Sequence, residues 1–154
     1  MATATYRVFK VRTGPLLPDP DIPGTRYHTV LFVETNEDKS GIRHHVTGDL
    51  VSGMVYDTGP AECPEDLDTF YNKEYIGNVL RSTYPKVVDL VLKGLPPPHK
   101  QKAFNRETMR TEPVKPDGTF YAPDEERFPL FKCTEWIEQK AIPALREAGV
   151  LRGE

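Results

Sequence analysis

The chain has 154 residues, a length that suits one domain with a hydrophobic core of its own. Its formal net charge of −3 and isoelectric point near 5.8 argue against a dedicated nucleic-acid-binding protein, because neutralising phosphates requires a basic surface. Two cysteines are too few for a disulfide framework. No apolar run has the length of a membrane span, and the polar N-terminal residues lack a signal-peptide core. We therefore expect a reduced, cytoplasmic protein.

Strand-forming residues dominate the first third of the chain. Residues 6–11 alternate between strand-forming apolar and polar side chains, which is typical of a strand. Residues 28–34 are apolar on both faces, and this pattern indicates a central strand. The polar stretch 36–41 has the length of a hairpin turn, so residues 42–47 are expected to pair back onto the central strand.

Two further strands are expected downstream. Residues 53–56 form a short fourth strand by composition. Residues 74–79 are assigned to a fifth, because Gly77 and the β-branched residues around it fit a helix poorly. The first half of the chain therefore predicts a largely antiparallel sheet.

Two helices complete the predicted fold. Residues 85–93 carry valine and leucine at helical spacing, and Gly94 ends the pattern. Residues 133–148 form a second apolar stripe. Pro143 lacks a backbone donor, so this helix is expected to kink near Gln139 or to divide into two.

Between these helices lies a long irregular segment, residues 95–129, which carries seven prolines and few apolar residues. A stretch of this length without regular structure is either functional or disordered. Phe120 and Tyr121 are the aromatic residues that we expect to contact a substrate if the segment covers a site. The alternative, given equal weight, is that this segment is a solvent-exposed surface loop that covers no site.

Cys133 and two histidines form the constellation that suggests chemistry. Cys133 stands at the start of the last predicted helix, where the helix dipole favours a thiolate. His28 opens the central strand and His45 lies on the next one, so a histidine brought beside Cys133 would complete its activation. The alternative is a packing role, because Cys133 also lies on the apolar stripe of its helix and cysteine is often a small buried hydrophobe.

This chain order resembles that of circularly permuted papain-like folds, which include lecithin:retinol acyltransferase-like enzymes and desumoylating isopeptidase-like hydrolases. The matching residues are 28–32, 44–46 and 132–136. The chain also resembles, nearly from end to end, an uncharacterised family of small fungal proteins. The first resemblance implies an α+β fold in which helices pack on an antiparallel sheet. It also implies that Cys133 is the nucleophile, His28 the base and His45 the group that orients His28.

Two features depart from this assignment. The residue before the nucleophile is commonly asparagine in such enzymes, and here it is Lys132. Strand periodicity groups His44, not His45, with the apolar Ile42 and Val46, because neighbouring residues of a strand point to opposite faces. We follow the resemblance and select His45, and His44 remains the alternative.

The sequence therefore predicts a cysteine-dependent enzyme that transfers an acyl group from an amide, ester or thioester, with a small-molecule substrate and a possible role in tailoring a metabolite. Hydrolysis, transfer and cyclisation remain open, as do the substrate and the oligomeric state. The alternative is a non-catalytic domain that binds a small ligand or a protein. No close pair of metal ligands, glycine-rich phosphate loop or dinucleotide fingerprint is present, so no metal or cofactor is expected.

Overall fold

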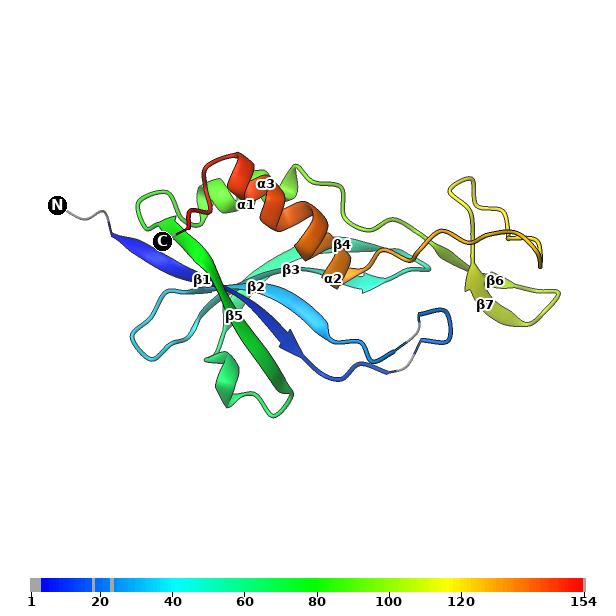
Figure 1. Ribbon diagram of the computed structural model, residues 1–154, viewed down its shortest axis with the longest axis horizontal. Coiled ribbons are helices and arrows are strands. Elements are labelled where there is room, and N and C mark those ends of the chain that lie inside the picture. The colour runs from blue at the N-terminus through cyan, green and yellow to red at the C-terminus, as the bar shows by residue number, and fades with distance from the viewer. Residues whose placement is uncertain (1–3, 18, 23, 154) are drawn as a thin grey trace.

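A five-stranded antiparallel sheet with the order β4-β3-β2-β1-β5 runs through the centre of the computed structural model (Figure 1). The structure describes residues 4–17, 19–22 and 24–153. The strands are β1 (Thr5–Thr13), β2 (His28–Glu34), β3 (Gly41–Asp49), β4 (Gly53–Ala61) and β5 (Phe70–Leu80). The predicted α+β class with an antiparallel sheet is confirmed, and β2 occupies the central position that its two apolar faces predicted.

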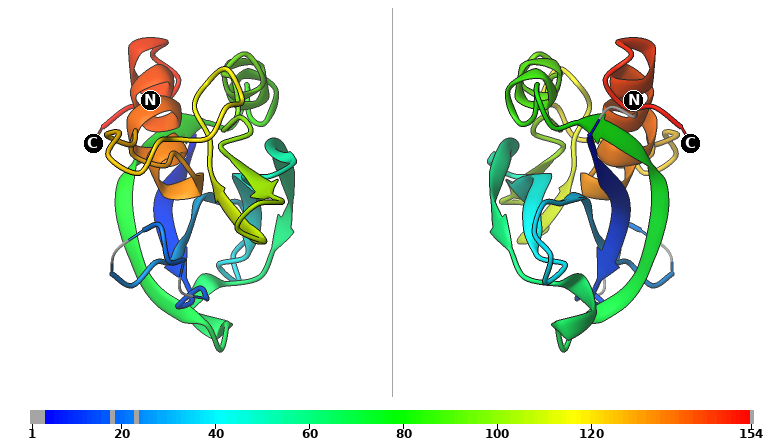
Figure 2. Two further views of the ribbon diagram at one scale, coloured as in Figure 1. Left: turned by 90° about the vertical axis from the view of Figure 1, so that its right-hand side faces the viewer. Right: turned by 90° about the vertical axis from the view of Figure 1, so that its left-hand side faces the viewer.

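The helices lie together on one face of the curved sheet, as Figure 2 shows. They are α1 (Lys86–Lys93) and a continuous helical run made of α2 (Cys133–Trp136), η2 (Ile137–Ala141) and α3 (Ile142–Glu147). A one-turn helix, η1 (Pro64–Asp66), precedes β5. Among the described residues, no helix is long and apolar enough to cross a membrane.

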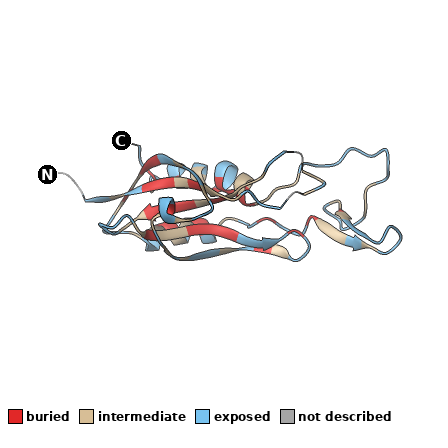
Figure 3. Cartoon of the chain, turned by 90° about the horizontal axis from the view of Figure 1, so that it is seen from below, coloured by how far each residue is buried: buried red, intermediate tan, exposed pale blue. Residues whose placement is uncertain are grey.

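The main hydrophobic core fills the space between the sheet and these helices. Trp136 and Leu92, from the helices, and Leu31, from β2, are almost completely buried there. A second, smaller cluster on the opposite face of the sheet contains Phe9 and Phe32. The buried residues accordingly concentrate in the middle of the strands and on the inner sides of the helices (Figure 3).

The last helical run is interrupted where the sequence predicted a kink. Its middle turn, η2, is π-helical, and the N–H of Ile142 bonds to the carbonyl of Ile137, five residues earlier. Pro143 cannot donate the next bond to Gln139, because its ring nitrogen carries no hydrogen. The wider turn therefore accommodates the proline and separates α2 from α3, so the helical run is interrupted at the predicted place.

At one end of the sheet, β2 and β3 separate and are no longer paired. The two strands are paired only from Glu34↔Gly41 to Leu31↔His44, whereas β3 stays paired with β4 as far as Asp49↔Gly53. Residues 28–30 are still paired with β1 on their other side. The backbone edge of residues 28–30 that faces away from β1 is therefore free for contacts other than a strand.

The prediction that residues 95–129 lack regular structure is corrected over their middle part. Two four-residue strands, β6 (Lys102–Asn105) and β7 (Arg110–Pro113), pair as a hairpin that projects from the main body at the end opposite the chain termini (Figure 1). Its turn is closed by the N–H of Met109, which donates to the carbonyl of Asn105 at 2.7 Å. Neither strand has an apolar alternation, so the pairing itself, which is invisible to a periodicity search, defines them.

Gly77 in β5 occupies a position that only glycine fits. Its φ is +146°, and a Cβ built on it would lie 2.5 Å from the carbonyl oxygen of Arg152. Gly77→Ala is therefore expected to lower the free energy of unfolding by about 2 kcal/mol, because it combines backbone strain with a clash against backbone. Urea unfolding measures the change. Gly59→Ala in β4 is the matched control, since the nearest atom to its Cβ is 3.8 Å away; equal effects of the two changes would contradict the prediction.

Candidate functional site

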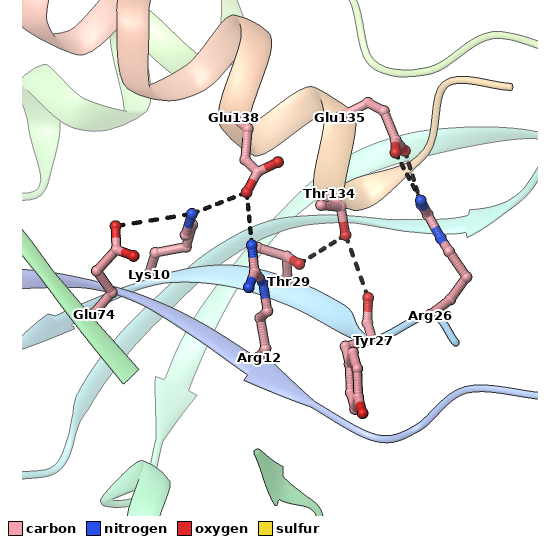
Figure 4. Close-up of polar contacts among 9 residues, drawn as sticks. All are labelled: Lys10, Arg12, Arg26, Tyr27, Thr29, Glu74, Thr134, Glu135 and Glu138. Atoms are coloured by element: carbon pink, nitrogen blue, oxygen red, sulfur yellow. Dashed lines mark hydrogen bonds and ion pairs between the residues drawn. The ribbon is translucent and has the colours of Figure 1, made fainter. Parts of the chain in front are cut away.

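Cys133 is the first residue of α2, and only 3% of its surface is exposed. The next residue ties this helix start to the beginning of β2 (Figure 4). The hydroxyl of Thr134 donates to the carbonyl oxygen of Tyr27 at 3.3 Å and shares a hydrogen bond of 2.7 Å with the hydroxyl of Thr29. Cys133 is thereby held against the part of β2 that has no partner in β3.

Glu135 fixes the same helix start from the other side (Figure 4). Its carboxylate accepts two hydrogen bonds from the guanidinium of Arg26, at 2.7 and 2.8 Å, and one from the N–H of Lys132 at 3.0 Å. Burial raises the pKa of Glu135, but the hydrogen bonds from Arg26 and Lys132 outweigh burial and lower it overall. Glu135 is therefore ionised at neutral pH and anchors α2 to the loop that leads into β2.

A third contact holds the π-helical turn. Glu138 accepts hydrogen bonds from Lys10 at 2.9 Å and from Arg12 at 2.8 Å, both on β1 (Figure 4). The contacts of Thr134, Glu135 and Glu138 thus run to β1, to β2 and to the loop between them. The position of Cys133 relative to the sheet is consequently fixed by three side chains, two on α2 and one on η2.

His28 and His45 contact each other directly. Nε2 of His28 lies 2.8 Å from Nδ1 of His45, and the two rings meet edge to face with centroids 5.0 Å apart. His28 opens β2 and His45 lies on β3, at the place where the two strands part. The structure therefore brings His45, and not His44, to His28.

The Cys133 thiol lies beside the His28 ring, and this neighbourhood changes its acidity. Burial raises the pKa of Cys133, but hydrogen bonding from the His28 ring and from the N–H of Thr29 outweighs burial and lowers the pKa overall. The charge of His28 acts in the same direction. Thr29 belongs to the stretch of β2 that has no partner in β3. The three residues selected from the sequence thus gather at the split in the sheet, and their catalytic roles remain predictions.

Asp57 is a neighbour of this group that the sequence analysis did not select. It is the cross-strand partner of His45 in the β3–β4 ladder, and its Oδ2 lies 3.3 Å from Nε2 of His45. Arg43 approaches the same nitrogen, with its Nε at 3.4 Å. Burial and then the charge of His28 lower the pKa of His45, while Asp57 opposes the change. The expected fourth strand ended at Tyr56, one residue before Asp57, so only the register between the strands would have found it.

His44 lies on the opposite face of β3, inside the main core. Its Nδ1 and Nε2 are each 2.6 Å from a tyrosine hydroxyl, of Tyr56 and Tyr84 respectively. Tyr56 in turn donates to Asp89 of α1 at 2.8 Å. Burial lowers the pKa of His44 to about 4, so this ring is neutral at physiological pH. Its grouping with Val46 by periodicity is confirmed, and its surroundings are those of a structural histidine.

A cavity of about 390 Å³ opens beside the two histidines. It lies on the face of the sheet opposite the helices, and most of its wall is apolar. The lining residues are Val11, Thr13, His28, Val30, Phe32, Arg43, His45, Pro60, Ala61, Glu62, Pro64 and Leu67. Cys133 is not among these residues, whereas His28 lines the cavity.

Phe120 and Tyr121 lie elsewhere. They line a different cavity, of about 750 Å³, together with Phe104 and other residues of the β6–β7 hairpin. Phe120 forms an isolated bridge with Val114, just after β7, which keeps this pair next to the hairpin. The structure therefore does not bring them to His28 and His45, and the interpretation that their segment covers a site at Cys133 gains no support from their placement.

No group of three or more metal-ligating side chains of the kind that could hold a metal ion occurs within residues 4–17, 19–22 and 24–153. A family model, described as a family of unknown function (DUF6540), matches residues 16–152. No curated protein and no solved structure matches the chain. The relation to permuted papain-like folds therefore remains a prediction from the resemblance.

Proposed function

Because the chain belongs to DUF6540, a family of unknown function, we propose an activity from its own site: cysteine-dependent acyl transfer from an amide, ester or thioester of a small molecule. One arrangement carries the proposal: Cys133 opens α2 beside His28, and Nε2 of His28 is hydrogen-bonded to Nδ1 of His45 at 2.8 Å. Contacts with His28 and with the N–H of Thr29 favour a lowered pKa of Cys133 in spite of burial. A buried thiol without such partners would have a raised pKa.

We propose a separate role for each ring nitrogen of His28. Nε2 of His28 is occupied by His45, so Nδ1 is the atom that takes the thiol proton. The thiolate then forms a bond to the substrate carbonyl carbon. The resulting oxyanion is stabilised by the N–H of Cys133, because the first N–H groups of a helix have no intrahelical partner. The oxyanion then collapses and the bond from the carbonyl carbon to the leaving group breaks, while His28 gives its proton to the leaving group. Water, an amine or an internal nucleophile next attacks the acyl carbon and releases the acyl group from sulfur.

The cavity beside the histidines supports a small substrate. Its volume of about 390 Å³ falls within the range of small-molecule sites, and its polar groups are few among apolar walls. His28 both lines this cavity and neighbours Cys133, so it would be the contact between a bound substrate and the thiol. An acyl group with a compact apolar body fits this cavity better than an extended polymer does.

A non-catalytic domain that binds a small ligand is the second candidate. It is favoured by the burial of Cys133, which packs within the main core cluster and does not line the cavity. On this alternative, the cavity still binds a ligand, and Cys133 contributes packing only.

Alkylation of the two thiols of the native protein distinguishes these functions. Cys63 is the internal control, because it is partly exposed in a loop, whereas Cys133 is buried. Exposure alone predicts that iodoacetamide modifies Cys63 first. Activation by His28 predicts the reverse, since the thiolate is the reactive species. We expect Cys133 to react faster than Cys63 at pH 7, measured by peptide mass spectrometry; an inert Cys133 beside a reactive Cys63 would reject the acyl-transfer proposal.

A further inference from the structure

His45 has two competing partners at one ring nitrogen. Oδ2 of Asp57 lies 3.3 Å from Nε2, and Nε of Arg43 lies 3.4 Å from the same atom. A carboxylate only accepts a hydrogen bond and a guanidinium only donates one. A neutral Nε2 therefore bonds to Asp57 when it carries the proton, and to Arg43 when it does not.

The position of the proton on His45 determines which ring nitrogen of His28 carries a proton. If Nε2 of His45 carries the proton, Nδ1 of His45 accepts from Nε2–H of His28, and Nδ1 of His28 has a free lone pair beside the thiol. If Arg43 donates to Nε2, the proton of His45 sits on Nδ1 and Nε2 of His28 must accept it. Nδ1 of His28 then carries a hydrogen and is unable to take the proton of Cys133.

We propose that Asp57 is a positioning residue that selects the reactive tautomers of His45 and His28, and that Arg43 opposes it. This inference rests on the proposed function and adds a regulator of the same site. Asp57 acts through His45 and touches neither the thiol nor the reacting atoms.

The arrangement of β3 and β4 supports this role. Asp57 and His45 face each other across the ladder, so the carboxylate is held at this position by the register of the sheet. Arg43 precedes His45 by two residues on the same face, and its guanidinium also donates to the carbonyl of Pro60 at 3.1 Å. Nη2 of Arg43 and Oδ2 of Asp57 are themselves 3.9 Å apart. The charged and titratable groups that face His45 are thus His28, Arg43 and Asp57.

Arg43 and Asp57 are both exposed enough that replacing one of them can change which residue bonds to Nε2 of His45. The side chain of Arg43 is 41% exposed and that of Asp57 is 48% exposed, whereas the side chain of His45 is 10% exposed. Burial keeps the pKa of His45 low, so at neutral pH the ring is uncharged and its tautomer matters. Replacing either charged residue therefore alters the tautomer without opening the core.

The first experiment reads the tautomer of His45 directly. Nitrogen NMR of the full chain at pH 7 is expected to place the proton of His45 on Nε2. In Asp57→Ala, Arg43 remains as the partner, and we expect the ratio of the two tautomers to move toward Nδ1 by about fivefold. Asp57→Glu should restore the original ratio, and Arg43→Gln should move it further toward Nε2. Glu37→Gln, in the exposed turn before β3, is the charge-matched control, because it removes one carboxylate charge away from this cavity. An unchanged ratio in Asp57→Ala would overturn the proposal.

The second experiment measures the consequence at the thiol. In a Cys63→Ser background, the rate at which iodoacetamide modifies Cys133 is recorded against pH. Asp57→Ala is expected to slow the reaction at pH 7 by about fivefold, with recovery in Asp57→Glu and no change in Glu37→Gln. A shifted tautomer with an unchanged rate would reject the positioning role of Asp57. A shifted tautomer with Cys133 inert even before Asp57 is replaced would instead reject the acyl-transfer function, and leave the action of Asp57 on His45 intact.

Discussion

Acidification is expected to remove about 3 kcal/mol from the free energy of unfolding through His44 alone. The unfolded chain takes up a proton on this side chain near its ordinary pKa of 6.5, whereas the folded protein does so only near 4, because burial excludes the charged form. Between these two values the unfolded state binds the proton and the folded state does not. Stability therefore falls as the pH is lowered through this window, and the loss levels off below about 4.

The hydrogen bonds of His44 explain why the neutral ring is preferred. Tyr56 donates to Asp89, so it accepts from Nδ1–H of His44, and Tyr84 donates to Nε2. A proton added at Nε2 would make the Tyr84 oxygen the acceptor, and the Tyr84 hydroxyl hydrogen would lose its acceptor inside the core. The network satisfies every ring nitrogen of the neutral form and has no place for a second proton.

Urea unfolding as a function of pH measures this effect. His44→Gln keeps a hydrogen-bond donor and an acceptor at similar spacing but does not titrate. Its free energy of unfolding should therefore fall less steeply between about pH 6.5 and 4, because unfolding of the variant takes up about one proton fewer than unfolding of the wild type. His99→Gln, which changes an exposed histidine, is the control and should retain the wild-type slope. If His44→Gln followed the wild-type curve, another group would be responsible for the acid sensitivity.

Periodicity and turn chemistry were sufficient to predict most of the sheet. Residues 28–34 were assigned to a central strand by their two apolar faces, and β2 is that strand. The kink near Gln139 followed from one proline, whose missing N–H has the same consequence in any helix. These elements were predictable because their causes lie within a few residues of the chain.

The features that were missed depend on partners distant in sequence. The strands β6 and β7 have no apolar pattern and exist because they pair with each other. Asp57 became visible only once β3 and β4 were aligned, since it faces His45 through the register of that ladder. Phe120 and Tyr121 were assigned to a substrate site from composition, but the hairpin beside them determines which cavity they line.

The separation of β2 from β3 explains why the residues of the candidate site can meet. A continuous ladder would occupy the N–H of Thr29 with a strand carbonyl, and the thiol of Cys133 would lose that donor. The contacts of Thr134 and Glu135 place the helix start at this opening. The same opening allows His28 to bond to His45 while it lies beside Cys133. The candidate site is thus a property of the sheet topology as much as of its side chains.

Removal of His28 is expected to have the largest effect on the thiol. In His28→Ala, the burial that raises the pKa of Cys133 remains, while the ring that lowers it by hydrogen bonding and by charge is absent. The pKa should therefore rise, and alkylation of Cys133 at pH 7 should slow by about tenfold, because a smaller fraction of the thiol is present as the reactive thiolate. The rate is measured on the Cys63→Ser protein, whose remaining thiol is Cys133.

Two controls separate this effect from a loss of structure. His28 opens its strand and is only partly buried, so His28→Ala should keep a cooperative thermal transition. His99→Ala, which removes an exposed histidine, should leave the alkylation rate unchanged. A folded His28→Ala protein that reacts as fast as its parent would show that His28 does not set the acidity of Cys133. The base of the proposed acyl transfer would then have to be sought elsewhere, whereas slow alkylation that recovers at high pH is the behaviour of a thiol that has lost its histidine.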